Sequence, residues 1–193
     1  MKNLFIALLL LVTSARLLAE KELQYTNYIY EPQIHTVLLY KPGTNVPVPV
    51  INLNTNDQLQ LSFDELASEN DYYHFTFIHC DANWNPSNLR PMEYLIGNNF
   101  DYINDFKFST NTYQKYVHYN VNFPGPDMRP KYSGNYLLKV YRNFDENDVV
   151  ITRRFFVLDC QNNVEFDIKP APVGPNRFSK QEVDFKATIN DYQ

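Results

Sequence analysis

The segment His79-Cys80-Asp81 has the residue types of a cysteine nucleophile with its base and an orienting acid. The run 72–80 alternates as a strand does, and adjacent side chains of a strand point to opposite faces. His79 therefore cannot activate Cys80 directly. His79 and Asp81 share a face and could hold a metal ion, but no third ligand lies at a suitable spacing. The segment predicts neither an enzyme nor a metal site.

The rest of the chain gives only weak indications of catalytic, cofactor-binding or nucleic-acid-binding residues. The five Gly residues are scattered, so no glycine-rich loop could wrap around a phosphate. Paired carboxylates such as Asp64-Glu65 and Asp145-Glu146 fall next to turns, where solvated acids are the default. Lys and Arg number 17 against 22 Asp and Glu, which makes nucleic acid a poor partner. We expect no enzyme, no cofactor and no small-molecule substrate.

Residues 1–19 have the pattern of a cleavable export signal. Lys2 supplies a positive start, and residues 4–12 form an apolar run too short to span a bilayer. Cleavage after Ala19, with Ala15 as the alternative, would leave a protein without a membrane anchor. The sole Asn-x-Ser/Thr sequence contains Pro86, which blocks glycosylation. These features predict a protein of the bacterial periplasm that is not embedded in a membrane.

Cys80 and Cys160 are the chain's two cysteines. An even count in an oxidising compartment permits a disulfide. Both residues lie in apolar, strand-like runs, which equally suits two separate buried thiols. The spacing alone does not choose between these alternatives.

The pattern of apolar residues predicts an all-β fold, an antiparallel β-sandwich of the immunoglobulin-like kind. Short alternating runs are separated by Pro, Asn, Asp and Gly at intervals typical of such sandwiches. Predicted strands cover residues 25–31, 34–41, 48–53, 58–63, 72–80, 100–108, 113–123, 136–141, 149–158 and 164–168. A short helix is predicted within residues 89–95 alone.

Proline spacing predicts where the sandwich ends. Three prolines within residues 170–175 stiffen the chain and cannot occupy a central strand. We therefore expect a sandwich domain over residues 20–169 and a Pro-rich linker over 170–178. Residues 179–193 alternate like a strand that has no partner left in the chain. They are interpreted as the first strand of a truncated second domain, or as a strand that returns to the first sandwich.

Two loops supply candidate residues for binding a partner. The sole Trp lies in a polar, turn-rich loop, where it could anchor a partner or fold back over the end of the sandwich. Residues 122–130 form a proline-stiffened loop, and a stiff loop loses little entropy on docking. The candidate partner-binding residues are Trp84, Arg90, Tyr94, Pro124, Pro126 and Arg129.

A series of short motifs resembles the N-terminal domain of the plug protein of the bacterial type IX secretion system. The resemblance covers roughly residues 25–169 and rests on the joint order and spacing of the motifs. They are Tyr28-Ile29-Tyr30, Ile34-His35-Thr36-Val37, the loop 79–90, Glu93-Tyr94-Leu95-Ile96-Gly97, Ser109-Thr110-Asn111-Thr112, Tyr116-Val117-His118-Tyr119, Ser133-Gly134-Asn135-Tyr136-Leu137-Leu138 and Arg153-Arg154-Phe155-Phe156-Val157.

The resemblance implies a non-enzymatic periplasmic subunit, peripherally associated with the outer membrane. Such a subunit docks on the outer-membrane β-barrel translocon of the secretion system and closes its periplasmic mouth when no cargo is passing. Members of that family are longer than this chain, which agrees with a truncated second domain. The alternative interpretation from the residues is a secreted carbohydrate-binding β-sandwich module, because exposed Tyr and Trp side chains stack on sugars.

Overall fold

The computed structural model describes residues 21–44, 48–159, 163–171 and 179–188. The chain divides into two compact units, with the boundary between Leu158 and Asp159. The predicted signal at 1–19 and Cys160 lie outside the described residues, as does most of the predicted linker.

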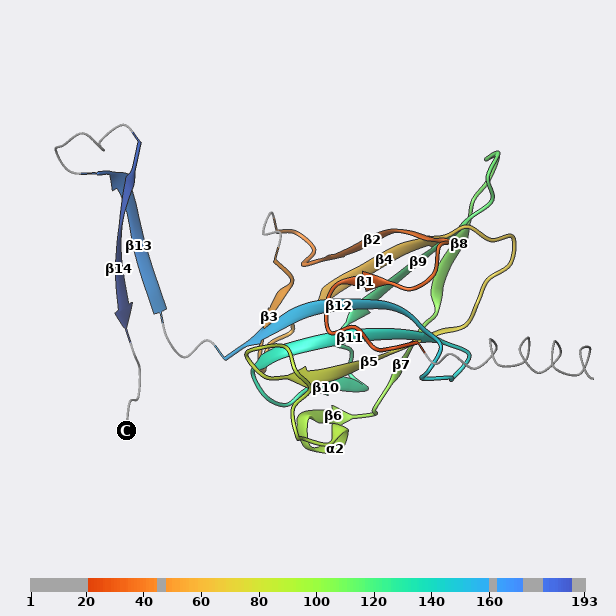
Figure 1. The fold of residues 1–193 in the computed structure, drawn as a ribbon, viewed down its shortest axis with the longest axis horizontal. Coiled ribbons are helices and arrows are strands. Elements are labelled where there is room, and N and C mark those ends of the chain that lie inside the picture. The colour runs from red at the N-terminus through yellow and green to blue at the C-terminus, as the bar shows by residue number, and fades with distance from the viewer. Residues whose placement is uncertain (1–20, 45–47, 160–162, 172–178, 189–193) are drawn as a thin grey trace, which may run out of the picture. The chain divides into compact units, whose positions relative to one another are not determined.

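Two β-sheets lie face to face in the first unit (Figure 1). The strands of one sheet are β1 (Tyr28–Ile29), β3 (Val50–Asn52), β5 (Tyr73–Cys80), β7 (Asp101–Ile103), β11 (Gly134–Arg142) and β12 (Val149–Leu158). Their order is β1-β12-β11-β5-β7, and β3 pairs with β12 in parallel. The strands of the other sheet are β2 (Ile34–Tyr40), β4 (Leu59–Glu65), β9 (Val117–Phe123) and β8 (Asp105–Phe108), in that order. The predicted all-β antiparallel sandwich is confirmed, with β3 as a parallel exception.

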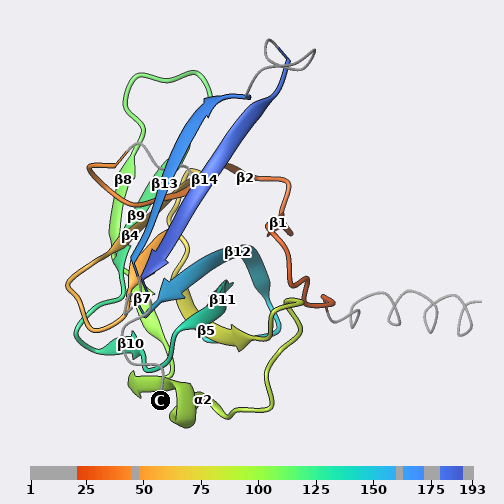
Figure 2. The same cartoon turned by 90° about the vertical axis from the view of Figure 1, so that its left-hand side faces the viewer.

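A smaller two-stranded sheet lies at one end of the sandwich. It pairs β6 (Leu95–Gly97) with β10 (Met128–Pro130) in antiparallel fashion, and the four-residue helix α2 (Pro91–Tyr94) leads into β6. Figure 2 shows α2 and β10 at this end of the unit, near the end of β12. Gly97 allows the close approach, because a Cβ at this position would overlap the backbone carbonyl oxygen of Asp127.

The core between the sheets follows the alternation that the sequence predicts. In β4, Leu59, Leu61 and Phe63 are fully buried, and Phe123 and Tyr119 of the neighbouring strand β9 lie directly beside Leu59 and Phe63 on the same sheet face. The rings of Phe63 and Tyr119 stack with centroids 4.9 Å apart. Aromatic pairs of this kind add to the free energy gained from burial alone. In these two strands the core side chains recur at every second residue.

One predicted strand begins later than expected. The run 113–123 predicts a single strand, but β9 starts at Val117, and Tyr113 is fully exposed in the preceding loop. The hydroxyl oxygen of Ser109 accepts hydrogen bonds from Thr112 and from the backbone N–H of Tyr116. Such side-chain bonds to the backbone favour a turn over a ladder, so Tyr113 cannot join the strand face.

The second unit contains a β-hairpin of β13 (Asn163–Pro170) and β14 (Gln181–Thr188). The sequence analysis assigned residues 164–168 to the sandwich domain ending at 169 and expected no partner for the strand beyond the linker. In the structure the first unit ends at Leu158, and these two segments pair with each other. The two strands pair along their whole length in antiparallel register, so each supplies backbone hydrogen-bond partners to the other. One face of the hairpin carries the exposed apolar residues Val164, Phe166, Ile168, Val183 and Phe185.

Candidate functional site

The segment His79-Cys80-Asp81 has no arrangement for nucleophilic catalysis. His79 lies on the inner side of β5, with its ring centroid 5.1 Å from that of Tyr136, while Cys80 points the other way. Burial raises the pKa of the Cys80 thiol to about 11, so the thiol is protonated at neutral pH. Cys80 is a free, buried thiol. In the described part of the chain, no group of three or more His, Cys, Asp or Glu side chains could hold a metal ion.

Trp84 folds back onto the sandwich. The guanidinium of Arg154 lies over the indole ring, and the ring of Phe156 contacts it edge-on at 5.4 Å between centroids. Trp84 is half-buried and has a positive φ of 67°. Because Arg154 covers one face of the indole, that face is closed to a sugar ring. The structure therefore gives this side chain a packing partner within the chain.

Arg90 precedes the short helix α2, and Tyr94 is the last residue of that helix. Tyr94 is buried, and its hydroxyl donates a hydrogen bond to the backbone carbonyl of Phe77 at 3.1 Å. Arg90 is exposed beside Glu93, whose carboxylate accepts a hydrogen bond from the Arg90 backbone N–H. Little of Tyr94 is left for a partner to touch, whereas Arg90 is open to solvent.

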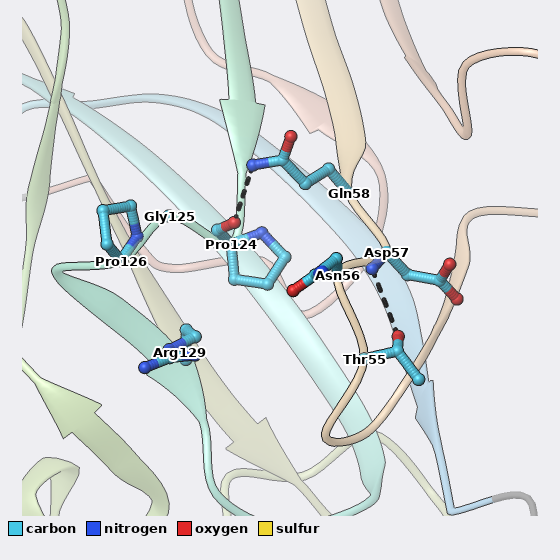
Figure 3. Close-up of a pocket in the computed structure, with 8 residues that line it drawn as sticks. All are labelled: Thr55, Asn56, Asp57, Gln58, Pro124, Gly125, Pro126 and Arg129. Atoms are coloured by element: carbon cyan, nitrogen blue, oxygen red, sulfur yellow. Dashed lines mark hydrogen bonds between the residues drawn. The ribbon is translucent and has the colours of Figure 1, made fainter.

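The other three candidate residues line one surface groove at the end of the sandwich. Pro124, Pro126 and Arg129 line a cavity of about 320 Å³ together with the turn 55–58 (Figure 3). In this view Pro124 lies between Arg129 and Asn56. The side-chain amide of Gln58 donates a hydrogen bond to the carbonyl of Pro124 at 3.0 Å, which ties the two walls together.

A second cavity of about 250 Å³ continues the groove, because Thr55, Pro124 and Arg129 line both cavities. Its lining contains more apolar residues, namely Ile51, Leu53, Ile96, Pro130 and Val157, beside the polar Asn52 and Asn54. We call the first cavity the polar lobe and the second the apolar lobe. Ile96 is 45% exposed, whereas Ile51 and Val157 are almost completely buried. The groove thus combines a polar lobe with an apolar lobe.

The turn that forms one wall is held by its own side chains. Thr55 Oγ1 donates to the carbonyl of Asn52 at 2.8 Å and accepts from the backbone N–H of Asp57. Asp57 also accepts a hydrogen bond from the backbone N–H of Asn52 at 3.0 Å and forms an ion pair with Lys41 at 2.7 Å. The interaction with Lys41 holds the pKa of Asp57 below its usual value. Asp57 is therefore charged but already neutralised by Lys41.

Arg129 is the uncompensated charge of the groove. Within the described ranges, it makes no ion pair and no side-chain hydrogen bond. Its neighbours Met128 and Pro130 are buried, so alternation along β10 turns Arg129 outward. The sequence analysis found Pro124, Pro126 and Arg129 from the proline-stiffened loop but missed residues 51–58 and Ile96. The cluster of turn formers Asn54-Thr55-Asn56-Asp57 could have indicated from the sequence that an exposed turn lies here.

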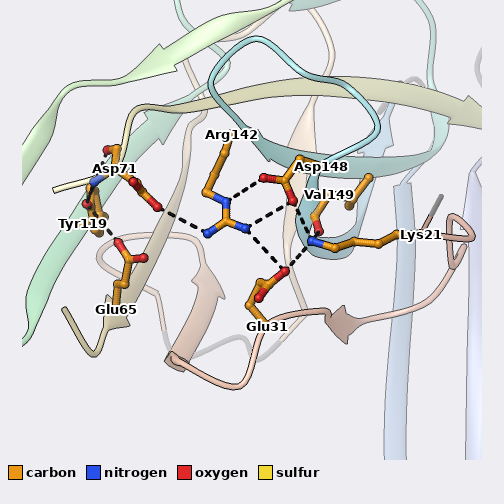
Figure 4. Close-up of polar contacts among 8 residues, drawn as sticks. All are labelled: Lys21, Glu31, Glu65, Asp71, Tyr119, Arg142, Asp148 and Val149. Atoms are coloured by element: carbon orange, nitrogen blue, oxygen red, sulfur yellow. Dashed lines mark hydrogen bonds and ion pairs between the residues drawn. The ribbon is translucent and has the colours of Figure 1, made fainter. Parts of the chain in front are cut away.

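A second polar cluster, built from two cations and three carboxylates, lies at the other end of β11 and β12 (Figure 4). Arg142 donates to Asp148 at 2.8 Å and pairs with Asp71 at 3.3 Å and Glu31 at 3.5 Å. Lys21 contacts both Glu31 and Asp148. Burial alone would raise the pKa of Asp148, but the hydrogen bonds from Arg142 and Lys21 outweigh it and lower that pKa. With every charge paired, this cluster ties the segment after residue 20 to the sandwich.

Comparison with protein families gives one match, and comparison with curated proteins gives none. The family is described as the type 9 secretion system plug protein 1st domain, and its model matches residues 34–159. Among the described residues, no helix has the length and apolar character that a membrane crossing requires.

Two solved structures are similar to different degrees. A hypothetical protein from Parabacteroides merdae aligns with a TM-score of 0.77 and 28% identity, over 89% of this chain and 43% of that chain. This chain thus spans less than half the length of that relative. The alkylpurine DNA glycosylase AlkC of Pseudomonas fluorescens, bound to DNA containing an abasic site analog, aligns at a TM-score of 0.35 and 12% identity over 65% of this chain and 30% of its own. That similarity is too low to indicate a shared fold.

Proposed function

We propose a function for this chain from its family: it belongs to the type 9 secretion system plug proteins, whose first-domain model matches residues 34–159. In this role it acts in the periplasm at the inner side of the outer membrane. It docks on the β-barrel translocon of the secretion system and closes the pore when no cargo is passing. The family match is the single observation that carries this proposal.

The side chains of the first unit support a binding role over a chemical one. Cys80 is protonated and has no base, because His79 points to the opposite side of β5. The groove, by contrast, offers an unpaired Arg129 between walls that are already hydrogen bonded. We assign the translocon contact to the surface that contains Pro124, Pro126 and Arg129. Stiff walls favour binding because little chain entropy is lost on docking.

Closure of a pore sets requirements on the strength of this contact. A seal that excludes solutes needs a buried area of at least roughly 1,600 Å², the usual size of a specific interface. An affinity near the nanomolar range, about 12 kcal/mol, would keep the pore closed. Cargo or another subunit must then contribute a competing interaction of similar size for the pore to open. The pore therefore stays closed only while neither cargo nor another subunit supplies this competing interaction.

The test uses the tagged full-length protein in its native host. Outer-membrane extracts should yield the translocon together with the tagged protein, and cells without the protein should admit large dyes through an assembled translocon. Arg129→Glu should reduce copurification at least about tenfold, because the substitution replaces the positive charge at the contact with a negative one. Lys107→Glu, a charge reversal at an exposed position on β8 outside the groove, is the matched control and should copurify normally. The proposal fails if no translocon copurifies, or if cells lacking the protein remain as impermeable as the parent.

A further inference from the structure

The arrangement of Arg129 and Ile96 allows the partner's chemistry to be specified. The two residues are cross-strand neighbours in the β6–β10 pair, so their side chains lie on the same face of this small sheet. Ile96 lines the apolar lobe, and Arg129 lines both lobes. A cation and an exposed aliphatic side chain therefore stand next to each other at the junction of the two cavities.

The charge of the groove selects an anionic group. Asp57, the acidic residue of its lining, is neutralised by Lys41, so the groove keeps the positive charge of Arg129 in a chain whose net charge is −5. A guanidinium binds a carboxylate or a phosphate through two parallel N–H···O hydrogen bonds, and the carboxylate is the anionic group that an unmodified protein chain supplies. The polar lobe adds the side chains of Thr55 and Asn56 as further hydrogen-bonding groups.

The distance between cross-strand neighbours sets the spacing of the ligand groups. Directly opposed Cα atoms in an antiparallel pair lie about 4.5–5.5 Å apart. In an extended peptide, side chains two residues apart lie on one side at about 6.5–7 Å, whereas adjacent side chains point to opposite sides. The spacing of two residues is the one that can place a carboxylate on Arg129 and an aliphatic side chain beside Ile96 together.

We propose that the groove binds an extended segment of a protein partner in which an acidic residue is followed two positions later by an aliphatic one. The carboxylate pairs with Arg129, and the aliphatic side chain enters the apolar lobe beside Ile96 and Pro130. This inference takes from the proposed function that the groove faces a protein partner. It adds the chemical pattern which that partner must present.

The test measures binding of short blocked peptides to the isotope-labelled 193-residue chain by amide chemical shifts. The probe is acetyl-Gly-Asp-Ser-Leu-Gly-amide, compared with an Asp→Asn version and with the adjacent arrangement acetyl-Gly-Asp-Leu-Ser-Gly-amide. The first peptide should shift the amides of Thr55, Ile96 and Arg129, with a dissociation constant near 1 mM, about 4 kcal/mol of binding free energy. The Asp→Asn version should bind at least about tenfold more weakly, because it loses the charge-assisted hydrogen bond to Arg129. The adjacent version should also bind more weakly, because its Leu side chain points away from Ile96.

Variants of the protein locate the binding. Arg129→Gln should weaken the Asp-Ser-Leu peptide at least about tenfold and abolish its preference over the Asn version. Ile96→Ser should weaken the two peptides in which Leu stands two positions after Asp or Asn, and Lys107→Gln, at an exposed position on β8, should change none. These side chains are exposed, so the substitutions should not disturb the fold. Amide shifts that match those of the unsubstituted chain away from the changed residue verify that each variant folds. Equal binding of the Asp and Asn peptides, shifts confined to other surfaces, or no shifts at about 10 mM peptide would overturn the inference.

The two proposals can fail separately. If Arg129→Glu loses the translocon while the isolated chain does not prefer the acidic peptide, the docking role stands and the ligand pattern is wrong. If the acidic peptide binds as described but no translocon copurifies, the groove recognises this pattern on another protein and the docking role is wrong.

Discussion

The guanidinium carbon of Arg154 lies 4.3 Å from the centre of the Trp84 ring. Arg154 also donates a hydrogen bond from Nε to the carbonyl of Tyr25 at 2.7 Å. One arginine on β12 therefore holds both the loop after β5 and the segment before β1. The prominent Trp of the sequence is an internal anchor for these two connections.

Replacing Trp84 should reduce stability. Trp84→Ala removes a cation–π contact and the edge contact with Phe156, and should lower the free energy of unfolding by about 1–3 kcal/mol. Urea denaturation followed by circular dichroism measures the change. Tyr113→Ala, at a fully exposed aromatic position, is the control and should change stability by less than about 0.5 kcal/mol. Equal effects of the two substitutions would show that the Arg154 contact contributes nothing.

Arg142 should be far more important for stability than an exposed arginine. Arg142→Met leaves Glu31, Asp71 and Asp148 with Lys21 as their remaining cation in this cluster. Breaking a buried pair on one side costs about 3–5 kcal/mol, and the partial exposure of this cluster favours the lower figure. Arg90→Met, whose side chain is 88% exposed, should cost less than about 0.5 kcal/mol. Thermal unfolding of the two variants under identical conditions measures how much stability each substitution removes.

Gly97 should not tolerate a side chain. Gly43 and Gly97 both have positive φ values, 75° and 92°, so Ala carries a backbone cost at either position. A Cβ at Gly43 meets nothing within 4 Å, whereas one at Gly97 overlaps the carbonyl oxygen of Asp127. Gly97→Ala should therefore destabilise the protein by at least about 1 kcal/mol more than Gly43→Ala. It should also weaken binding in the groove, because β10 carries Arg129. Matching unfolding curves for the two variants would contradict this account.

Stability should fall on mild acidification because of His74. This residue is 1% exposed, its ring lies 3.9 Å from that of Phe144 between centroids, and neither ring nitrogen has a hydrogen-bond partner among the described residues. Burial lowers the pKa of His74. The unfolded state, with a pKa of about 6.5, takes up a proton that the folded state resists, so the free energy of unfolding decreases as pH falls below that value.

The pH effect can be assigned with substitutions. His74→Phe should shrink the loss of stability between about pH 7 and pH 5, a window above the titration of ordinary carboxylates. The loss does not vanish, because burial also lowers the pKa of His79. If His74→Phe leaves the dependence of stability on pH unaltered, the burial of His74 is not the cause of the loss on acidification.

Local patterns were sufficient to predict most strands but not their partners. The run 149–158 became β12 with the predicted bounds, and Leu59, Leu61 and Phe63 are buried as their alternation predicts. The pairing of β13 with β14 was not predictable, since a period-two pattern does not state which strand completes the hydrogen bonds. The parallel pairing of β3 with β12 was missed for the same reason.

The candidate site was predictable in the part that lies within one loop. Pro124, Pro126 and Arg129 are close in sequence, and their composition marks a stiff exposed connection. Ile96 and Thr55 reach the groove through the β6–β10 pairing and the β3–β4 turn, which are tertiary features. The position of Trp84 was left open, because its contact with Arg154 joins residues far apart in the chain.

The pairing of β1 with β12 has a consequence for the order of folding. Tyr28 pairs with Thr152, and the hydroxyl of Thr152 donates to the carbonyl of Thr26, 126 positions away. Contacts of such long separation form late and slow the folding rate, because the loop between them must close first. The opening strand of the sandwich has no partner until the ribosome has delivered the chain beyond β12. In a chain still in synthesis, β1 therefore stays unpaired until β12 is complete.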